Sequence, residues 1–492
     1  MACCSCLKSC CSYCVLPCVS VLALVLGLLA IPNVFEAFES YVAQHPTTAG
    51  LIVAGVGDLY HCDLASAMPA SLRTCKAAGV ARTEGWVDYS FMPTFGAFAP
   101  GQSVGIVRSS HKAFKETVYD SQLLRDPDTV IIVNVSKIPK HALDTAWPGV
   151  FPIVIQMSTD DPERQARREL WADTLPALLE APEALPAFAV PSGVQAADFQ
   201  NQTARFEVVA LNVLRQLFGA EVDWDAAKLL EFRDDVTNFV GSSFQYRDGV
   251  VGAAARLFLG DPETGIRTFV PKREHIESQV FPCPAARRFM QEAERRGMAG
   301  SLRLREFLFA LFFAGLRGTP DMVDSIMKVI LREPKKFVPL FKADPEAFML
   351  EAARLNPTVG GLLGPVGKAS VFHAQNRYQE GIAGGPAHRE EAGDWYAAMI
   401  GGANLDPAVF GGPNKDPVYA ADFIPGREHA DRLVTWVTEL RDLRRCKDAA
   451  GCSEAPRPCP GTHLARRVAK QAVAFFVDGV DAARGPFGKS EL

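Results

Sequence analysis

The sequence predicts a large, mainly helical domain that follows a short apolar segment at the N-terminus. The chain has 492 residues, of which 48% are hydrophobic, enough to bury an extensive core. Residues 301–328 are mostly apolar, which is typical of a helix that runs through the middle of a large domain. Further along the chain, apolar residues recur at helical spacing and predict a second helix with one buried face, formed by Leu464, Val468, Ala472 and Phe475.

The first 40 residues differ in composition from the rest of the chain. Seven of the 13 cysteines lie within the first 18 residues, and residues 15–31 are almost wholly apolar. That length is close to the roughly 20 residues that span a bilayer, so we expect a membrane anchor, with a cleaved targeting signal as the alternative. Cysteines beside such a segment are candidates for palmitoylation. We therefore divide the chain into residues 1–40 and a folded domain over residues 41–492.

The charge of the chain argues against one class of function. The net charge is −5, and the basic residues form no block along the sequence. A nucleic-acid-binding domain needs a concentrated positive surface, so we expect no nucleic-acid partner.

A cysteine near the C-terminus is the strongest candidate for a functional residue. Cys459 lies in the Arg-Pro-Cys-Pro-Gly run of residues 457–461, directly before the predicted helix. The N-terminus of a helix presents unpaired N–H groups and the positive end of its dipole, and both favour a thiolate. A thiolate held in this way can ligate haem iron. A buried free cysteine is the alternative, whereas the spacing to Cys446 and Cys452 does not fit a zinc knuckle.

Two further patterns precede this cysteine. Glu351 and Arg354 are three residues apart in a segment that starts after Asp344-Pro345, so they lie on one helix face and can pair. The apolar stretch at 301–328 contains Ala-Gly-Leu-Arg-Gly-Thr at residues 314–319, where small residues allow close packing. Each pattern alone is common in buried or surface helices.

Taken in order, five motifs resemble those of the cytochromes P450. The resemblance is firm over roughly residues 300–480. The haem loop of that family, FxxGxRxCxG, is kept only in part, because Cys452 replaces the Phe and Ala455 replaces the first Gly. The matching segments are AGxxT at 314–319, ExxR at 351–354, NxDPxxF at 404–410, FxPxR at 423–427, and Arg457, Cys459 and Gly461 of the haem loop.

This resemblance implies a fold, a cofactor and residue roles. The fold would be mainly α with small β-sheets, and the cofactor would be haem b with Cys459 as the axial thiolate. Residues 160–168 resemble the start of a family helix that holds a haem propionate, with Arg164 at the usual His position. The implied cofactor-binding residues are Cys459, Arg457, Arg168, Arg164 and Gly461, and the implied structural triad is Glu351, Arg354 and Arg427.

The central helix departs from the family at the positions that deliver protons to bound oxygen. Most P450s carry an acid followed by threonine there, whereas this chain has Arg317 and Gly318, with Thr319 one place late. Arginine cannot act as a proton-donating acid at neutral pH. Pro320 should also open the helix near the carbonyl of Leu316. We expect the oxygen or peroxide pocket to be lined by Ala314, Gly315, Gly318 and Thr319, and Arg317 to meet a substrate carboxylate.

Three functions follow as hypotheses. The first is a monooxygenase that acts on a lipophilic small molecule with O₂ and electrons from an NADPH-dependent reductase. The second is a P450 that needs no reductase and uses a peroxide or a fatty-acid hydroperoxide; peroxygenase-type P450s resemble this chain in placing Arg at the acid position, and allene oxide synthase and hydroperoxide lyase relatives lack the acid–threonine pair. The third is a membrane-tethered binding protein without haem. We expect membrane association at the endoplasmic reticulum, with a plastid or another organelle as alternatives.

Overall fold

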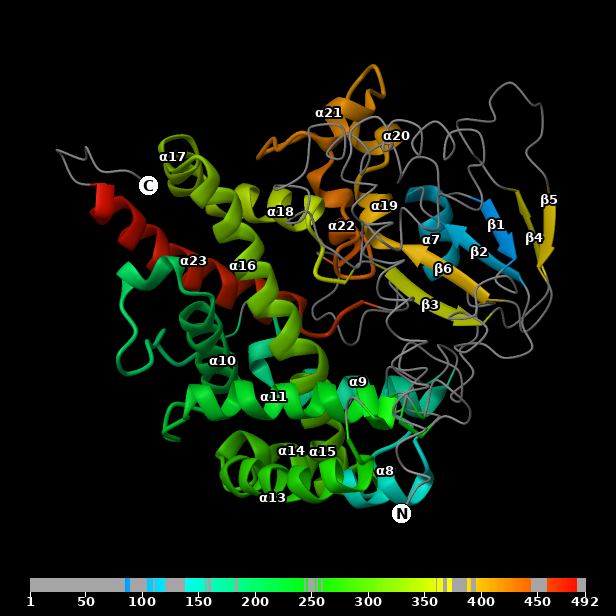
Figure 1. Cartoon of the computed structure of the whole chain (residues 1–492), viewed down its shortest axis with the longest axis vertical. Coiled ribbons are helices and arrows are strands. Elements are labelled where there is room, and N and C mark those ends of the chain that lie inside the picture. Colours follow the sequence, from blue (N-terminus) through cyan, green and yellow to red (C-terminus); the bar gives the residue numbers. More distant parts are fainter. Residues whose placement is uncertain are drawn as a thin grey trace, which may run out of the picture.

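The computed structural model is mainly helical, with two small β-sheets to one side (Figure 1). Its described residues are 138–154, 157, 161–180, 182, 185–242, 245–246, 253, 255–257, 260–359, 400–443 and 458–484, together with helix 111–119 and strands 85–88, 104–108, 361–365, 370–373, 387–390 and 395–399. The predicted fold class of helices with small sheets is confirmed for these residues. The predicted anchor at 15–31, and Arg457, lie outside them.

The helices follow one another along the chain with short connections. Their bounds are α7 His111–Tyr119, α8 Lys140–Ala146, α9 Pro162–Thr174, η3 Pro176–Leu178, η4 Ala196–Gln200, α10 Gln202–Phe218, α11 Ala226–Gly241, α13 Pro262–Val280, α14 Pro284–Arg295, α15 Gly300–Ala310, η6 Leu311–Gly315, α16 Leu316–Arg332, α17 Pro334–Ala343, α18 Pro345–Leu355, α19 Ile400–Asn404, α20 Pro407–Phe410, α21 Pro417–Ala421, η8 Ala430–Arg432, α22 Leu440–Leu443 and α23 Thr462–Arg484. Among the described residues, none of these helices is long and apolar enough to cross a membrane.

Helix starts are specified locally by side chains that accept hydrogen bonds from the first turn. Asp161, Asn201, Asp225, Asp261 and Asp344 each stand at the N-cap and accept from a backbone N–H one to three residues into the helix. Such caps satisfy N–H groups that have no partner within the helix, each contributing about 1 kcal/mol. The predicted helix start after Asp344-Pro345 is therefore observed.

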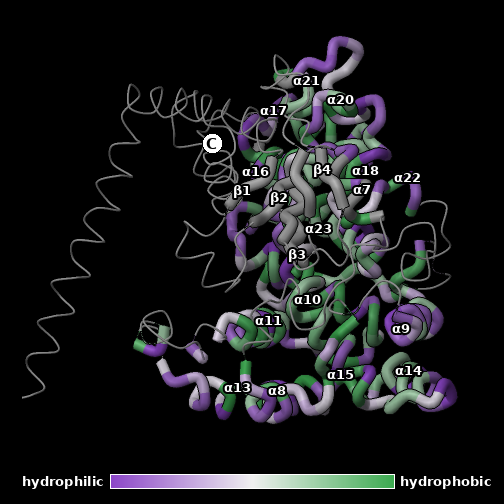
Figure 2. Tube along the Cα trace, turned by 90° about the vertical axis from the view of Figure 1, so that its right-hand side faces the viewer, coloured by the Kyte–Doolittle hydropathy of each residue, from purple (hydrophilic) through white to green (hydrophobic). Residues whose placement is uncertain are grey.

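The core is formed where α10, α16 and α23 pack against one another. The predicted stripe on α23 is buried at Leu464, Val468 and Ala472, but its fourth member is Phe476, because Phe475 is only partly buried. A shift of one residue turns a side chain about 100° around the helix, so the observed stripe follows the i+4 row throughout. Figure 2 shows hydrophobic and hydrophilic residues in turn along the outer helices α13 and α14, the pattern of helices with one buried face.

The predicted central helix is observed, but it is not a regular α-helix. The segments α15 and α16 are joined by the π-helical turn η6, Leu311–Gly315, and Leu316 has φ −81° and ψ 1°. Helix α16 continues through Pro320. A proline lacks the N–H that would bond to the carbonyl four residues earlier, so the distortion around Leu316 agrees with the opening predicted there.

Six strands form the two sheets. The larger sheet has the order β1 (Gly85–Asp88), β2 (Val104–Arg108), β6 (Trp395–Met399), β3 (Gly361–Pro365). Only the β2–β6 pair is parallel. The second sheet pairs β4 and β5, with the bounds Ser370–His373 and Ala387–Glu390.

A close backbone approach gives a first testable prediction. A Cβ added at Gly479 of α23 would collide with the carbonyl oxygen of Ala196 in η4. Overpacking of this kind costs about 1–3 kcal/mol, so Gly479→Ala should lower the midpoint of thermal unfolding. Gly265→Ala in α13 is the matched control, because its added Cβ would meet nothing within 4 Å. Equal unfolding midpoints for the two variants would show that η4 moves aside at no cost.

Candidate haem-thiolate site

Cys459 lies at the N-terminal end of α23, where the sequence predicts it. Its N–H donates to the carbonyl of Trp436 (3.1 Å), and its carbonyl accepts from the N–H (3.2 Å) and the hydroxyl (2.7 Å) of Thr462. The loop that carries the sulfur is thus fixed at its backbone on two sides. Gly461 follows closely, and a Cβ there would come within 3.9 Å of the sulfur, so a side chain at this position would lie over Sγ.

The electrostatic surroundings of the sulfur act in opposite directions. Burial raises the pKa of the Cys459 thiol, while the N–H of Gly461, the positive charge of Arg168 and the hydroxyl of Thr462 lower it. The net pKa shift is upward, so the helix N-terminus alone does not produce the thiolate that the sequence suggested. A bound cation would be needed to displace the proton, as is usual for metal-ligating cysteines.

Helix α9 brings two buried arginines to this region. Arg168 donates to the carbonyl of Pro458 (2.8 Å), the residue before the cysteine. Arg164, one turn earlier on the same helix, is only 5% exposed, and Arg168 is 4% exposed. The alternative of an exposed, charged helix start is therefore wrong at these two positions.

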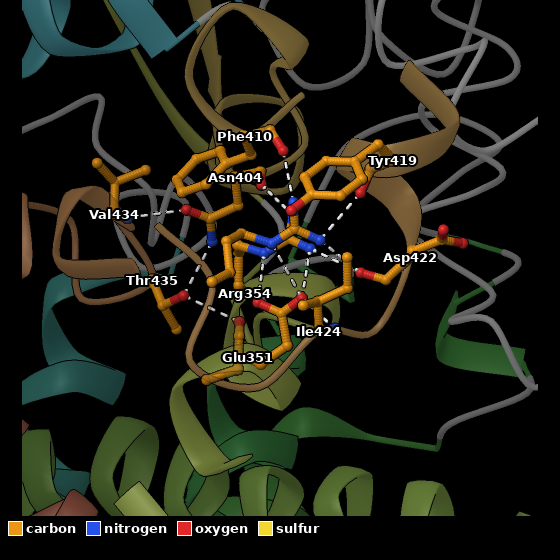
Figure 3. Close-up of polar contacts among 11 residues, drawn as sticks. Glu351, Arg354, Asn404, Phe410, Tyr419, Asp422, Ile424, Val434 and Thr435 are labelled. Carbon is orange, nitrogen blue, oxygen red and sulfur yellow. Dashed lines mark hydrogen bonds and ion pairs between the residues drawn. The ribbon is translucent and has the colours of Figure 1, made fainter. Parts of the chain in front are cut away.

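The residues of the predicted triad lie together in a buried network (Figure 3). Arg354 donates from Nε and Nη2 to the two carboxylate oxygens of Glu351, each at 2.8 Å, and Arg427 Nε lies 3.2 Å from Glu351 Oε1. All three side chains are about 1% exposed. Because the carboxylate also accepts from the N–H of Ile424 (2.9 Å), its oxygens are well satisfied in the interior.

The two arginines hold several loop segments through backbone carbonyls. Arg354 donates to the carbonyls of Asn404 (2.7 Å) and Asp422 (3.2 Å). Arg427 donates to the carbonyls of Phe410, Tyr419 and Asp422. The network therefore joins the ExxR, NxDPxxF and FxPxR segments around helix α18.

The amide of Asn404 extends this network toward the segment that contacts the cysteine. Its Nδ2 donates to Thr435 Oγ1 (2.9 Å) and its Oδ1 accepts from the N–H of Val434 (2.8 Å). Thr435 in turn donates to the carbonyl of Ala353 (2.9 Å). Since the next residue is Trp436, the triad and Cys459 are connected through one short stretch of backbone (Figure 3).

The central helix presents a different face at the predicted oxygen pocket. Ala314 and Arg317 are exposed within an otherwise buried helix, Gly315 and Gly318 are partly exposed, and Thr319 is buried. Arg317 makes no hydrogen bond or ion pair with the described residues. Gly318 approaches the loop after α18, where an added Cβ would lie 3.5 Å from Thr358 Oγ1. The exposed positions 314 and 317 are three residues apart and so share one face of the helix.

The sequence gave no signal for another buried charged cluster. Glu439 is fully buried and contacts Lys115 and His111, more than 320 residues earlier, as well as Arg432 and Arg441. His111 also donates its backbone N–H to Asp406 of the NxDPxxF segment (2.9 Å). No spacing rule could predict these partners, because none of them shares a helix with Glu439. Among the described residues, no group of three or more His, Cys, Asp or Glu side chains could hold a metal ion.

Comparisons with known proteins agree with the resemblance found in the sequence. No family model and no curated protein matches the chain. Similar solved structures are cytochromes P450. P450BioI in complex with an acyl carrier protein is 12% identical, with a TM-score of 0.47, over 84% of this chain and 91% of that one. CYP108D1 from Novosphingobium aromaticivorans is 16% identical, with a TM-score of 0.42, over 83% of this chain and 91% of that one. A thermophilic P450 from Sulfolobus tokodaii is 15% identical, with a TM-score of 0.44, over 77% of this chain and 87% of that one.

Proposed function

We propose that this protein is a divergent cytochrome P450, a haem-thiolate oxidoreductase with Cys459 as the axial ligand. The observation that carries the proposal is the placement of Cys459 at the start of α23, held by the Trp436 carbonyl and joined through it to the Glu351–Arg354–Arg427 network. At 12–16% identity the solved structures could share the fold without the activity. The proposal therefore rests on this chain's own residues.

The residues around Cys459 fit haem b in their chemistry. A soft sulfur ligand suits iron, and the buried guanidinium groups of Arg164 and Arg168 suit carboxylates such as the haem propionates. Arg457 would be a further propionate donor. Haem bound there would supply one-electron chemistry on oxygen or peroxide. The protein's part is to hold Cys459, to neutralise the propionates and to present the open face of the central helix to the substrate.

We place a monooxygenase first among the possible reactions. In that case an NADPH-dependent reductase would supply the electrons, and the substrate would be a lipophilic small molecule. Thr319 is buried and one position late, so proton delivery would depend on water or on a shift of this residue. Membrane attachment through residues 15–31 and residence in the endoplasmic reticulum are part of this proposal, and fractionation of cell membranes would test them.

One observation favours the second candidate, which uses a peroxide or a fatty-acid hydroperoxide without a reductase. Arg317 is exposed beside exposed Ala314, on the helix face where the family places its acid. A guanidinium can bind a fatty-acid carboxylate through two parallel hydrogen bonds. This arrangement gives the substrate a fixed charged end and leaves the apolar chain to the rest of the pocket.

A single assay separates the candidates. Purified haem protein is mixed with a polyunsaturated fatty-acid hydroperoxide, without NADPH or reductase, and the conjugated-diene absorbance is followed. Rapid loss that depends on Cys459 supports hydroperoxide chemistry. Absence of loss, together with turnover when a reductase is added, supports the monooxygenase. Failure to bind haem at all supports the third candidate, a membrane-tethered binding protein.

The role of Arg317 gives a second testable prediction. If hydroperoxide is consumed, Arg317→Leu should raise KM about 10- to 100-fold, because a charged hydrogen bond contributes about 1.5–3 kcal/mol. Arg317→Lys, which keeps the charge, should retain part of the affinity. The methyl ester of the same substrate is the control, since it has no carboxylate and should be converted equally by both proteins. An unchanged KM for the free acid would remove Arg317 from the site.

A further inference from the structure

Residues 433–443 form a tight turn against the cysteine loop. Within it, Val434 accepts from the N–H of Val437 (2.8 Å), and Leu433 accepts from the N–H of Leu440 (3.1 Å). Val437 has φ 75°, a left-handed conformation that is unfavourable for a β-branched residue. Such a conformation persists only where surrounding contacts impose it, and these are found most often near functional sites. Trp436, which accepts from the Cys459 N–H, is the residue just before Val437.

The contacts that impose this turn converge on Glu439. Its side chain is 0% exposed, and its carboxylate lies 2.9 Å from Lys115 Nζ, 2.6 Å from Arg441 Nε and 3.4 Å from Arg432 Nε. His111 Nε2 lies 3.3 Å away. Lys115 also approaches Asp442 (3.7 Å). These contacts tie the turn to helix α7 on one side and to η8 on the other.

A buried carboxylate with several cationic partners specifies geometry more than it adds stability. Burial of a charge costs several kcal/mol, which the partners offset but rarely exceed. In this turn the result of that geometry is the position of the Trp436 carbonyl three residues away. The Cys459 N–H is bonded to that carbonyl, so movement of Glu439 would be transmitted to the cysteine loop.

We propose that Glu439 is a positioning residue for the axial ligand: it clamps the 433–443 turn so that the Trp436 carbonyl holds the backbone of Cys459. This inference rests on the proposed haem-thiolate function. Glu439 does not touch the sulfur and acts only through the turn. Its loss should therefore change how firmly the thiolate is held before it changes the overall fold.

The test compares Glu439→Gln with Glu277→Gln, a matched control. Glu277 is also a buried carboxylate with two arginine partners, Arg273 and Arg305, but it lies on α13, whose neighbours are α8 and α11. Each variant is loaded with haem, and the spectrum of the reduced CO complex is followed over time. We expect Glu439→Gln to convert from the thiolate-type to the thiol-type spectrum at least tenfold faster than wild type, while Glu277→Gln keeps the wild-type rate. Equal rates in the two variants would overturn the proposal.

A second measurement does not require haem. Alkylation of Cys459 by iodoacetamide, measured by peptide mass spectrometry, should be faster in haem-free Glu439→Gln than in wild type. Cys283, which is also buried, is the internal control and should react at the same rate in both. If wild type binds no haem, the proposed function fails. A faster reaction at Cys459 alone would then still show that Glu439 holds the loop, and equal alkylation rates would refute the clamp.

A milder variant covers the case in which Glu439→Gln does not fold. Lys115→Met removes one donor, on a side chain that is 32% exposed, and leaves the carboxylate with its arginine partners. It should fold and show the same two changes to a smaller degree. If Lys115→Met folds and neither measurement changes, the clamp is refuted.

Discussion

Replacement of Cys459 by serine is expected to abolish the thiolate-type spectrum of the reduced CO complex and all haem-dependent turnover. A serine hydroxyl keeps the size of the side chain but is a hard, weakly acidic ligand in place of the soft thiolate. The backbone contacts with Trp436 and Thr462 do not involve the sulfur, so the fold should be kept. The measurement is the difference spectrum of the variant beside that of wild type, with circular dichroism as the check on folding.

Cys283→Ser is the matched control for this variant. Cys283 is also a free, buried cysteine, and its pKa is raised by burial, but it lies at the N-cap of α14. Its replacement should leave the spectrum unchanged. A thiolate-type spectrum that persists in Cys459→Ser would show that another cysteine ligates the iron, or that the ligand is not a cysteine.

The second large effect is expected from the buried triad. Arg354→Met should destabilise the protein by about 3–5 kcal/mol, because it leaves the Glu351 carboxylate and the carbonyls of Asn404 and Asp422 without a donor in the interior. Loss of this amount approaches the whole stability of an average domain, so we expect little soluble, haem-loaded protein. Denaturant unfolding and the yield of haem protein measure the effect.

An exposed pair with the same spacing is the control for the triad. Glu292 and Arg295 are also three residues apart on a helix, and Arg295 is 72% exposed. Surface pairs contribute about 0–1 kcal/mol, so Arg295→Met should change the free energy of unfolding by less than that. Similar destabilisation by Arg354→Met and Arg295→Met would mean that burial adds nothing to the triad.

The elements that the sequence predicts well are those specified by neighbouring residues. The start of α18 follows from Asp344-Pro345, and the end of α10 follows from Gly219, which has φ 111°. The triad was predictable only because its segments keep a recognisable order, since 76 residues separate Glu351 from Arg427. Hydrophobic periodicity predicted the central helix, but not the π-helical turn at Leu311–Gly315, which changes the facing of residues around it.

The surroundings of the cysteine were less predictable, for physical reasons. Its position at a helix start could be read locally, whereas the direction of its pKa depends on how much of the protein surrounds it. The Glu439 cluster joins α7 to the turn before α22 across more than 320 residues. Such contacts depend on the tertiary fold and leave no periodic trace in the sequence.

The way in which the triad binds its loops has a consequence for divergence. Arg354 and Arg427 bond to the carbonyl oxygens of Asn404, Phe410, Tyr419 and Asp422, and every residue type has such an oxygen. An anchor that recognises main chain tolerates exchange of the side chains along the loop, as long as the path of the backbone is kept. Sequence can therefore drift between the anchoring positions while the scaffold beneath the cysteine stays the same, which explains how a chain with an eroded haem loop can retain an intact triad.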